Sequence, residues 1–167
     1  WHAKTRRVEL WGEPLADILN HALTPLVEAA SGLGAGSLVP TYPWPVHYGR
    51  DGRIDIHLDQ SDNELSLSYQ VRVFRRRSQQ QQHGAVQWPL FFVDTGLQLG
   101  PGEDGPGELP LQADVVQRAP PVALRNNDGV LYRGRDVAHW RPPQATGVEL
   151  YQLVFAWRRI DDRACHG

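Results

Sequence analysis

The sequence contains no methionine, a single cysteine and no long apolar run, and each absence excludes a class of protein. With only Cys165 there is no internal disulfide framework, so we expect a reducing compartment and a cytoplasmic location. No stretch approaches the roughly 20 apolar residues that span a bilayer, and the first residues lack a signal-peptide pattern, so we expect no membrane partner. Because methionine is absent, we expect that the native start is missing and that a targeting segment could precede it.

An excess of charge of one sign is also missing. The formal net charge is −2 at pH 7, so no basic field across the molecule favours nucleic acid as a partner. The length of 167 residues suits one domain that buries a sizeable core without disulfides. We therefore expect a single domain over residues 1–167, with its core at about residues 38–158.

We expect three polar or small-residue segments to take no part in binding or catalysis. The arginine run at residues 75–77 is interpreted as a solvated face. Residues 78–84 are of low complexity and residues 99–110 are rich in glycine and proline, so both are expected to be loops. We interpret these loops as variable insertions rather than active-site lids.

The remaining pattern predicts one helix followed by many short strands. Apolar residues recur at helical spacing over residues 15–27, with Pro14 suited to the first turn, Gly32 to the end, and Pro25 a place where the helix could restart. Short β-rich runs separated by turn residues come next. They cover residues 44–48, 53–59, 64–74, 88–94, 121–125, 130–133 and 148–158. This pattern predicts a mainly β fold, a sandwich or jelly roll with an N-terminal supporting helix.

One strand carries two candidate metal ligands. Side chains alternate along residues 53–59, so His57 and Asp59 are expected on one face and their apolar neighbours on the other. An H-x-D triplet is common by chance, and alone it fits an ordinary surface strand. His139 follows about eighty residues later as a candidate third ligand. Two imidazoles and one carboxylate, with open positions opposite, are the ligands that non-haem Fe(II) oxygenases use to activate O₂.

The surrounding sequence adds an ordered series of motifs. These are PTYPW at 40–44, HYGRDGR at 47–53, HLD at 57–59, WPL at 88–90, NDGVLYRG at 127–134 and HWR at 139–141. Together they resemble the 2-oxoglutarate and Fe(II)-dependent dioxygenases, particularly a subgroup with a PTY segment, a Tyr-x-x-x-Gly turn before H-x-D, and YRG followed by HWR. The resemblance extends over most of the chain, from about residue 38 to residue 155.

The resemblance implies a double-stranded β-helix, a jelly-roll and cupin-like fold, in which His57, Asp59 and His139 bind Fe(II) and carry the catalysis. It also implies 2-oxoglutarate and O₂ as cosubstrates, with release of succinate and CO₂. In related halogenases a small residue replaces the carboxylate, so the presence of Asp59 favours a hydroxylase. The expected substrate is a small molecule or a peptide side chain.

The residue that anchors the far carboxylate of 2-oxoglutarate is less evident. A guanidinium is the preferred partner, and many relatives place one about ten positions after the distal histidine, where residues 146–150 offer no cation. Arg141 is our first candidate, because an extended strand would place it on the same face as His139. It could equally be a surface cation stacked on the tryptophan before it. Arg133 is the second candidate, and the hydroxyl of Tyr48 is the third.

Other polar and aromatic residues are given ordinary structural roles. Ser66 and Ser68 could line the pocket but are expected on a solvent face, and His47 is expected to be a structural histidine. Trp88 and Trp140 are interpreted as core or rim aromatics.

Two alternative functions stay open at this point. One is a cupin-type metalloenzyme that does not use 2-oxoglutarate, although such enzymes usually show an H-x-H set. The other is a non-catalytic jelly-roll binding module; the complete set of three candidate ligands argues against it, but the missing downstream cation keeps it open.

Overall fold

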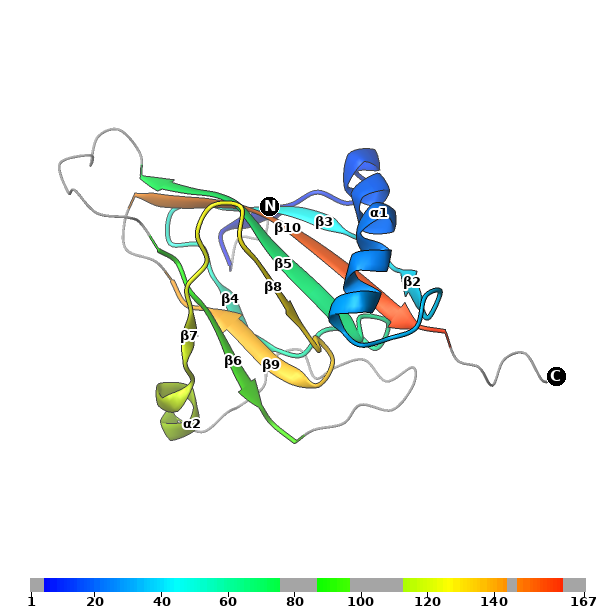
Figure 1. Cartoon of the computed structure of the whole chain (residues 1–167). Helices are drawn as coiled ribbons and strands as arrows, with labels where there is room; N and C mark the ends of the chain where they lie inside the picture. The colour runs from blue at the N-terminus through cyan, green and yellow to red at the C-terminus, as the bar shows by residue number, and fades with distance from the viewer. Residues whose placement is uncertain (1–4, 76–86, 97–112, 144–146, 161–167) are drawn as a thin grey trace.

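The computed structural model describes residues 5–75, 87–96, 113–143 and 147–160, and Figure 1 shows two β-sheets with a helix against the larger one. The loops expected at residues 78–84 and 99–110, like Cys165, lie outside the described residues. None of the described helices is long and apolar enough to cross a membrane.

The larger sheet has six strands, all paired antiparallel. Its order is β1-β3-β10-β5-β8, and β2 also pairs with β10. The bounds are β1 Arg7–Glu9, β2 Leu38–Pro40, β3 Trp44–Tyr48, β5 Leu65–Arg75, β8 Gly129–Tyr132 and β10 Val148–Arg159. The long strand β10 therefore holds this sheet together, because it pairs with β5 along one edge and with β3 and β2 along the other.

The smaller sheet has four antiparallel strands in the order β4-β9-β6-β7. Their bounds are β4 Ile54–His57, β6 Leu90–Asp94, β7 Pro121–Val122 and β9 Val137–Arg141. This mainly β architecture confirms the fold class expected from the sequence. The short strands β1 and β2 and the strand β9 were not among the expected β-rich runs, whereas the other strands fall within or close to them.

Helix α1, Pro14–Ala30, is the supporting helix that the sequence predicts. The Glu13 carboxylate accepts a hydrogen bond from the Ala16 backbone N–H at 2.8 Å, which satisfies one of the free donors of the first turn. The helix continues through Pro25 without a restart. It ends before Gly32, whose φ of +68° favours glycine. A second helix, α2, is short and covers Ala113–Arg118.

The outer face of the larger sheet and helix α1 form an apolar core. Its buried residues are Val27, Leu38, Leu65, Phe155 and Trp157. Because this face of the sheet is covered by the helix, Leu65 of β5 and Phe155 and Trp157 of β10 point away from the space between the sheets. The consequence is that the polar side chains of β5 point into that space.

This arrangement corrects one expectation. Ser66 and Ser68, expected on a solvent face, are both almost completely buried, as is Gln70 two positions further along β5. They lie on the inner face, where part of the interior is polar. A second apolar cluster, which includes Val46, Trp88 and Leu150, fills another part of the space between the sheets.

Candidate metal centre

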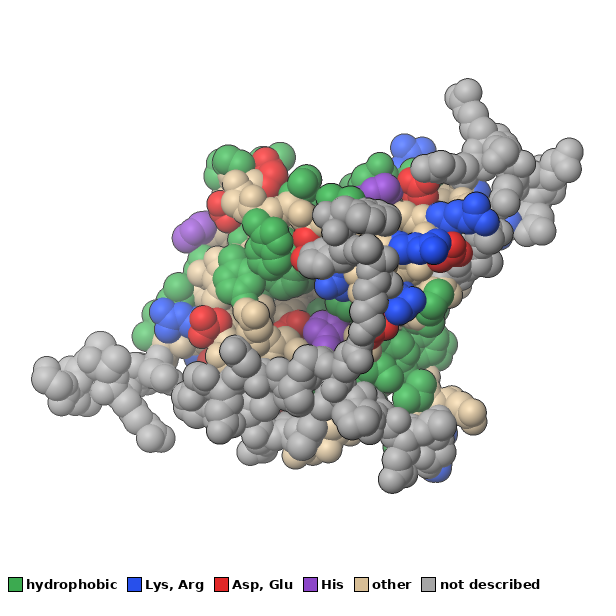
Figure 2. All heavy atoms as spheres, turned by 180° about the vertical axis from the view of Figure 1, so that it is seen from behind, with side chains coloured by type: hydrophobic (Ala, Val, Ile, Leu, Met, Phe, Trp, Pro, Cys, Tyr) green, Lys and Arg blue, Asp and Glu red, His purple; other side chains and the backbone are tan. Residues whose placement is uncertain are grey.

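A cavity opens between the two sheets. It is lined by residues of every strand except β2 and β7, and by the segments that follow β1, β2 and β4. Figure 2 shows a hollow on this face of the molecule, with a histidine side chain in it and hydrophobic side chains beside it. The cavity contains His57, Asp59 and His139, so the structure brings together the three residues expected as metal ligands.

Strand pairing in the smaller sheet positions the two histidines. β4 pairs with β9 so that His57 lies directly opposite His139, and the ring centroids are 4.2 Å apart. A register shift lies between Ile54 and His57, so β4 does not follow simple alternation. As a result Ile54 lines the cavity together with His57. Asp59 follows just beyond the end of β4, and the ligand atoms of the three residues lie within 4.8 Å of one another.

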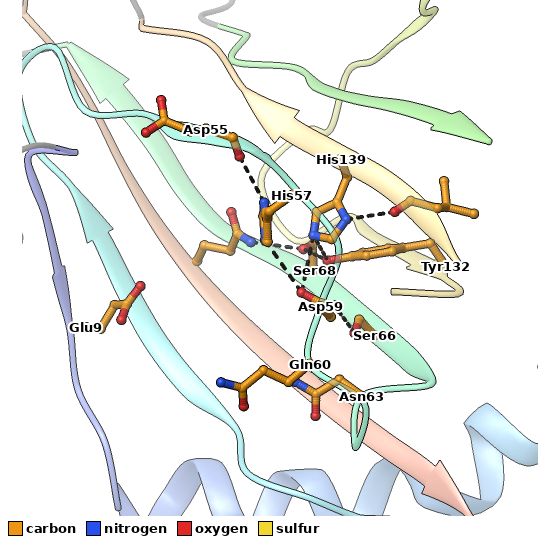
Figure 3. Close-up of polar contacts among 12 residues, drawn as sticks. Glu9, Asp55, His57, Asp59, Gln60, Asn63, Ser66, Ser68, Tyr132 and His139 are labelled. Atoms are coloured by element: carbon orange, nitrogen blue, oxygen red, sulfur yellow. Dashed lines mark hydrogen bonds and ion pairs between the residues drawn. The ribbon is translucent and has the colours of Figure 1, made fainter. Parts of the chain in front are cut away.

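Backbone carbonyls orient both imidazole rings. His57 Nδ1 lies 2.9 Å from the Asp55 carbonyl, and His139 Nδ1 lies 3.0 Å from the Val137 carbonyl. A carbonyl can only accept, so Nδ1 carries the proton in each ring and Nε2 is the atom left for a cation. Figure 3 shows both rings directed toward Asp59, with Tyr132 beside His139.

The two carboxylate oxygens of Asp59 have different partners. Oδ1 lies 3.6 Å from His57 Nε2 and 3.4 Å from His139 Nε2. Oδ2 accepts a hydrogen bond of 2.6 Å from the Ser66 hydroxyl on β5. Ser66 therefore leaves Oδ1 as the single oxygen directed at the two imidazoles, as a monodentate metal ligand requires.

Gly134 allows the carboxylate to take this position. The Asp59 backbone N–H donates to the Gly134 carbonyl at 2.9 Å, so the two segments are in direct contact. A Cβ atom on Gly134 would lie 2.1 Å from Asp59 Oδ2 and 2.5 Å from the Ser66 hydroxyl oxygen. Any side chain at this position would displace the carboxylate.

The charges of the three residues are coupled. Burial alone would raise the pKa of Asp59, but charge and hydrogen bonding from His139 and His57 outweigh burial and hold that pKa well below its usual range. Burial alone would lower the pKa of His139, yet the Asp59 carboxylate raises it. For His57, burial and the nearby His139 lower the pKa. The carboxylate thus favours a positive charge beside it, and a bound divalent cation would supply that charge.

The donor set fits an octahedral divalent metal. Ligand atoms in neighbouring positions are about 3 Å apart when the bonds are about 2.1 Å long. The Nε2–Oδ1 distances of 3.4 and 3.6 Å are slightly longer, so a small contraction would close the site. Two imidazoles and one monodentate carboxylate leave three positions for other ligands, as in the facial triad of non-haem iron enzymes.

A chain of polar contacts leads from His139 into the interior. The Tyr132 hydroxyl lies 3.4 Å from His139 Nε2 and 3.3 Å from the Ser68 hydroxyl. The Gln152 amide donates to the same serine oxygen at 3.0 Å. Burial raises the pKa of Tyr132, so its hydroxyl stays protonated and available as a donor. Tyr132, Ser68 and Gln152 all line the cavity, and Tyr48 lines it as well.

Arg141 lies at the end of this chain, completely buried. Its guanidinium donates to the Trp88 carbonyl and, at 3.1 Å, to Gln152 Oε1, while its Nε has no hydrogen-bond partner. Among the described residues no carboxylate pairs with it, and its charge instead faces the ring of Tyr48 at 5.8 Å. Burial lowers the pKa of Arg141 to about 10, so it remains charged at neutral pH. The structure therefore holds a buried cation that lacks an anion in the part of the chain it describes.

The other sequence candidates lie elsewhere. Arg133 is exposed, and its Nε binds Asp136 Oδ2 at 2.7 Å, outside the cavity. His47 Nε2 lies 3.0 Å from Glu149 Oε2, in keeping with a structural role. Trp88 and Trp140, on which the sequence left core and rim positions open, are both buried.

Several residues of the site were missed as candidates. The roles of Tyr132, Gln152 and Gly134 depend on contacts between strands that the sequence does not specify. One signal was present for Gln152, because it interrupts the apolar alternation of Val148, Leu150 and Val154 along the last strand. A polar residue at such a position indicates either a buried hydrogen bond or a site.

Comparison with known proteins supports the fold. Neither a protein-family model nor a curated protein sequence matches the chain. A prolyl-4-hydroxylase from Pseudomonas putida is 15% identical, and the alignment covers 96% of this chain and 77% of that one with a TM-score of 0.54. HygX from Streptomyces hygroscopicus, solved with nickel and 2-oxoglutarate bound, is 10% identical, with 91% and 69% covered and a TM-score of 0.56. At these identities the likeness is one of fold.

Proposed function

We propose that the chain is a non-haem Fe(II) and 2-oxoglutarate-dependent oxygenase that hydroxylates an unactivated C–H bond of a small molecule or a peptide side chain. The observation that carries the proposal is the convergence of His57 Nε2, Asp59 Oδ1 and His139 Nε2 inside the cavity. Fe(II), 2-oxoglutarate and O₂, when bound, supply the oxidising power, and succinate and CO₂ are released.

The protein's own part begins with the metal ligands. His57 and His139 present neutral Nε2 atoms because their Nδ1 protons are bound by backbone carbonyls. Asp59 contributes one oxygen because Ser66 holds the other. These contacts orient the ligands before a metal arrives and leave one side of the site open toward the cavity, where a cosubstrate and a substrate have access.

Recognition of 2-oxoglutarate is assigned to the inner end of the cavity. The positive charge of Arg141 lies directly behind Gln152 and Tyr48 of the cavity wall, without a carboxylate among the described residues, and a buried cation of this kind favours an anionic ligand. The far carboxylate of 2-oxoglutarate would provide that charge, next to the hydroxyls of Tyr48 and Ser68. The exposed Arg133, already paired with Asp136, is a weaker candidate for this role.

Anaerobic spectroscopy separates the proposal from both alternatives. Addition of Fe(II) and 2-oxoglutarate to the protein should produce the metal-to-ligand charge-transfer absorption of a chelated keto acid. Iron binding without this absorption would favour a cupin-type metalloenzyme, and the absence of iron binding would favour a non-catalytic module.

Alanine variants of the histidines test the ligands themselves. His57→Ala or His139→Ala should each abolish stoichiometric Fe(II) binding and succinate formation with the fold retained, because one of three protein ligands is lost. If both variants bind iron and convert 2-oxoglutarate like the parent protein, the metal assignment is wrong.

A further inference from the structure

Three aromatic side chains form a continuous surface along one wall of the cavity. We call Trp11, Tyr42 and Trp44 the aromatic platform. The ring centroids of Trp11 and Trp44 are 5.4 Å apart with 20° between the planes, and Tyr42 lies 5.7 Å from each of them. All three side chains line the cavity, and all are partly exposed.

Hydrogen bonds connect the platform to the segment that carries a metal ligand. The Tyr42 hydroxyl donates to Gln60 Oε1 and accepts from Asn63 Nδ2 at 3.4 Å. Gln60 directly follows Asp59, and Figure 3 shows Gln60 and Asn63 beside it. A group that rests on the platform therefore lies in the same cavity as the candidate metal centre.

Trp11 is held in place by its backbone rather than by burial. The preceding residue, Leu10, donates its N–H to the Pro45 carbonyl at 3.0 Å, and Gly12 with a φ of +68° turns the chain toward helix α1. Trp11 nevertheless remains 58% exposed. A large aromatic side chain that is fixed but uncovered is typical of a binding surface, because a tryptophan that serves packing is largely buried.

The geometry and the charges of this wall indicate an uncharged ligand. Centroid separations of 5.4 to 5.7 Å mean that the rings contact one another, so no space for an ammonium group remains between them. Trp11 and Trp44 are stacked and Tyr42 is tilted against them by 51° and 35°, so the platform presents ring faces in mutual contact and not separate walls around a cation. The neighbouring carboxylate in the cavity, Glu9, is neutralised by Arg7, whose Nε lies 2.7 Å from it.

We propose that the aromatic platform binds an uncharged, apolar ring of the primary substrate and so places a C–H bond of that substrate beside the metal centre. The oxidation of this bond depends on the proposed function, whereas ring binding does not. Trp11 is the specificity-determining residue of the platform, because it offers the most exposed ring face.

Two matched probes test the ring preference on the full chain. N-acetylphenylalaninamide presents a neutral ring and N-acetyllysinamide a cation of similar length, and ligand-observed NMR titration measures the binding of each. The protein should bind the neutral probe, and its affinity for the cationic probe should be lower by about tenfold or more. Stronger binding of the cationic probe, or no binding of the neutral probe, would overturn the proposal.

Trp11→Ala tests the residue, and Tyr151→Ala is its control. Tyr151 is an aromatic residue that is 43% exposed and lies outside the cavity. Trp11→Ala should lower the affinity for N-acetylphenylalaninamide by about tenfold, and Tyr151→Ala should leave this affinity unchanged. Trp11→Gln, which keeps a side chain of some length without the ring, should behave like Trp11→Ala. Parent-like affinity in both folded Trp11 variants would contradict the platform.

Calorimetry on the same proteins separates this proposal from the proposed function. Mn(II) and 2-oxoglutarate should bind the Trp11 variants and the parent protein equally, because no ligand has been altered. If the parent protein binds neither, the proposed function fails, and the probe titrations still decide whether the platform binds rings.

Discussion

Gly134 sets the distance between the turn after β8 and the Asp59 carboxylate. Because a Cβ atom there would lie 2.1 Å from Asp59 Oδ2, Gly134→Ala should displace the carboxylate and break its bond from Ser66. Loss of a contact that orients a metal ligand typically costs about 10- to 100-fold in metal affinity. Calorimetric titration with Mn(II) measures the loss.

Gly34→Ala is the matched control for this substitution. A Cβ atom on Gly34 would meet only the Ser37 hydroxyl at 3.5 Å, an ordinary contact. Metal affinity should therefore be unchanged in Gly34→Ala. If the Gly134→Ala protein binds metal with the affinity of the parent protein, the Asp59 carboxylate does not need the close approach of residue 134.

Arg141 carries the second prediction at the scale of the residue. Arg141→Leu removes the buried charge proposed to face the far carboxylate of 2-oxoglutarate, and loss of one partner of a buried charged pair typically costs about 2 to 5 kcal/mol. The affinity for 2-oxoglutarate should fall by more than about tenfold, while Fe(II) binding should change little. Anaerobic titration of 2-oxoglutarate into the Fe(II) form measures the first affinity, and anaerobic titration of Fe(II) into the metal-free protein measures the second.

Arg133→Leu provides the comparison. Its side chain is exposed and paired with Asp136, so its loss should leave the affinity for 2-oxoglutarate near that of the parent protein. An unchanged dissociation constant in Arg141→Leu together with a large increase in Arg133→Leu would transfer the role to Arg133.

The sequence points to the three candidate ligand residues, which the structure brings together, more readily than to the residues that orient them. His57, Asp59 and His139 are recognisable because few residue types bind metals and their motifs are ordered along the chain. No comparable sequence signal identifies Ser66 and Gly134, because serine and glycine are common. Their roles arise only where β5 and the turn after β8 meet.

Helix α1 shows the limits of periodicity at the scale of the element. Leu26 and Val27 both belong to the apolar series, yet Val27 is 3% exposed and Leu26 is 63% exposed. Val27→Ala should lower the free energy of unfolding by about 2 kcal/mol, because it opens a cavity in the core under the helix. Denaturant unfolding measures the change.

Leu26→Ala removes more carbon atoms from the same helix and serves as the control. Because the side chain is mostly in water, the change should stay within about 0.5 kcal/mol. A larger loss for Leu26→Ala than for Val27→Ala would mean that the helix packs through its other face.

Strand β5 shows why the polarity of a strand face does not reveal whether that face lies toward solvent or toward the interior. Alternation correctly separates the serines from the leucines, but it does not say which side is solvent. The apolar side contacts helix α1, so Ser66 and Ser68 face the interior and become part of the site. An alternating strand has a polar interior face wherever a helix covers the outside and a polar site lies within.

At the scale of the whole molecule, the candidate metal centre joins the two sheets. His57 and His139 belong to the smaller sheet, and Asp59 is bonded to Ser66 of the larger one. Metal bound at about 100 times its dissociation constant should stabilise the folded state by about 2.7 kcal/mol. For a chain of this length that corresponds to a rise in Tm of about 5 to 10 °C, measurable by calorimetry with Mn(II).

A chelator and a ligand variant complete this measurement. EDTA should return Tm to the metal-free value, and the His57→Ala protein should show no rise at the same Mn(II) concentration. A comparable rise in His57→Ala would place the stabilising metal at another site.

The fold class was predictable because several weak motifs agree in order and spacing over most of the chain. The strand order was not, because it depends on pairings between segments far apart, such as β3 with β10 and β4 with β9. The short strands β1 and β2 are too brief to show a period, and the pairing partner defines them more than their own residues do.

The pairing of His57 with His139 also bears on how the chain reaches its native state. Side chains alternate along a strand, so a slip of one residue between β4 and β9 would place Ala138 or Trp140 opposite His57. The two histidines are about 80 residues apart, so their pairing has to close a large loop at a cost in chain entropy. Only a chain with the native register can offer both imidazoles to one ion. Metal binding would therefore stabilise molecules in which β4 and β9 are correctly paired over those with a shifted register.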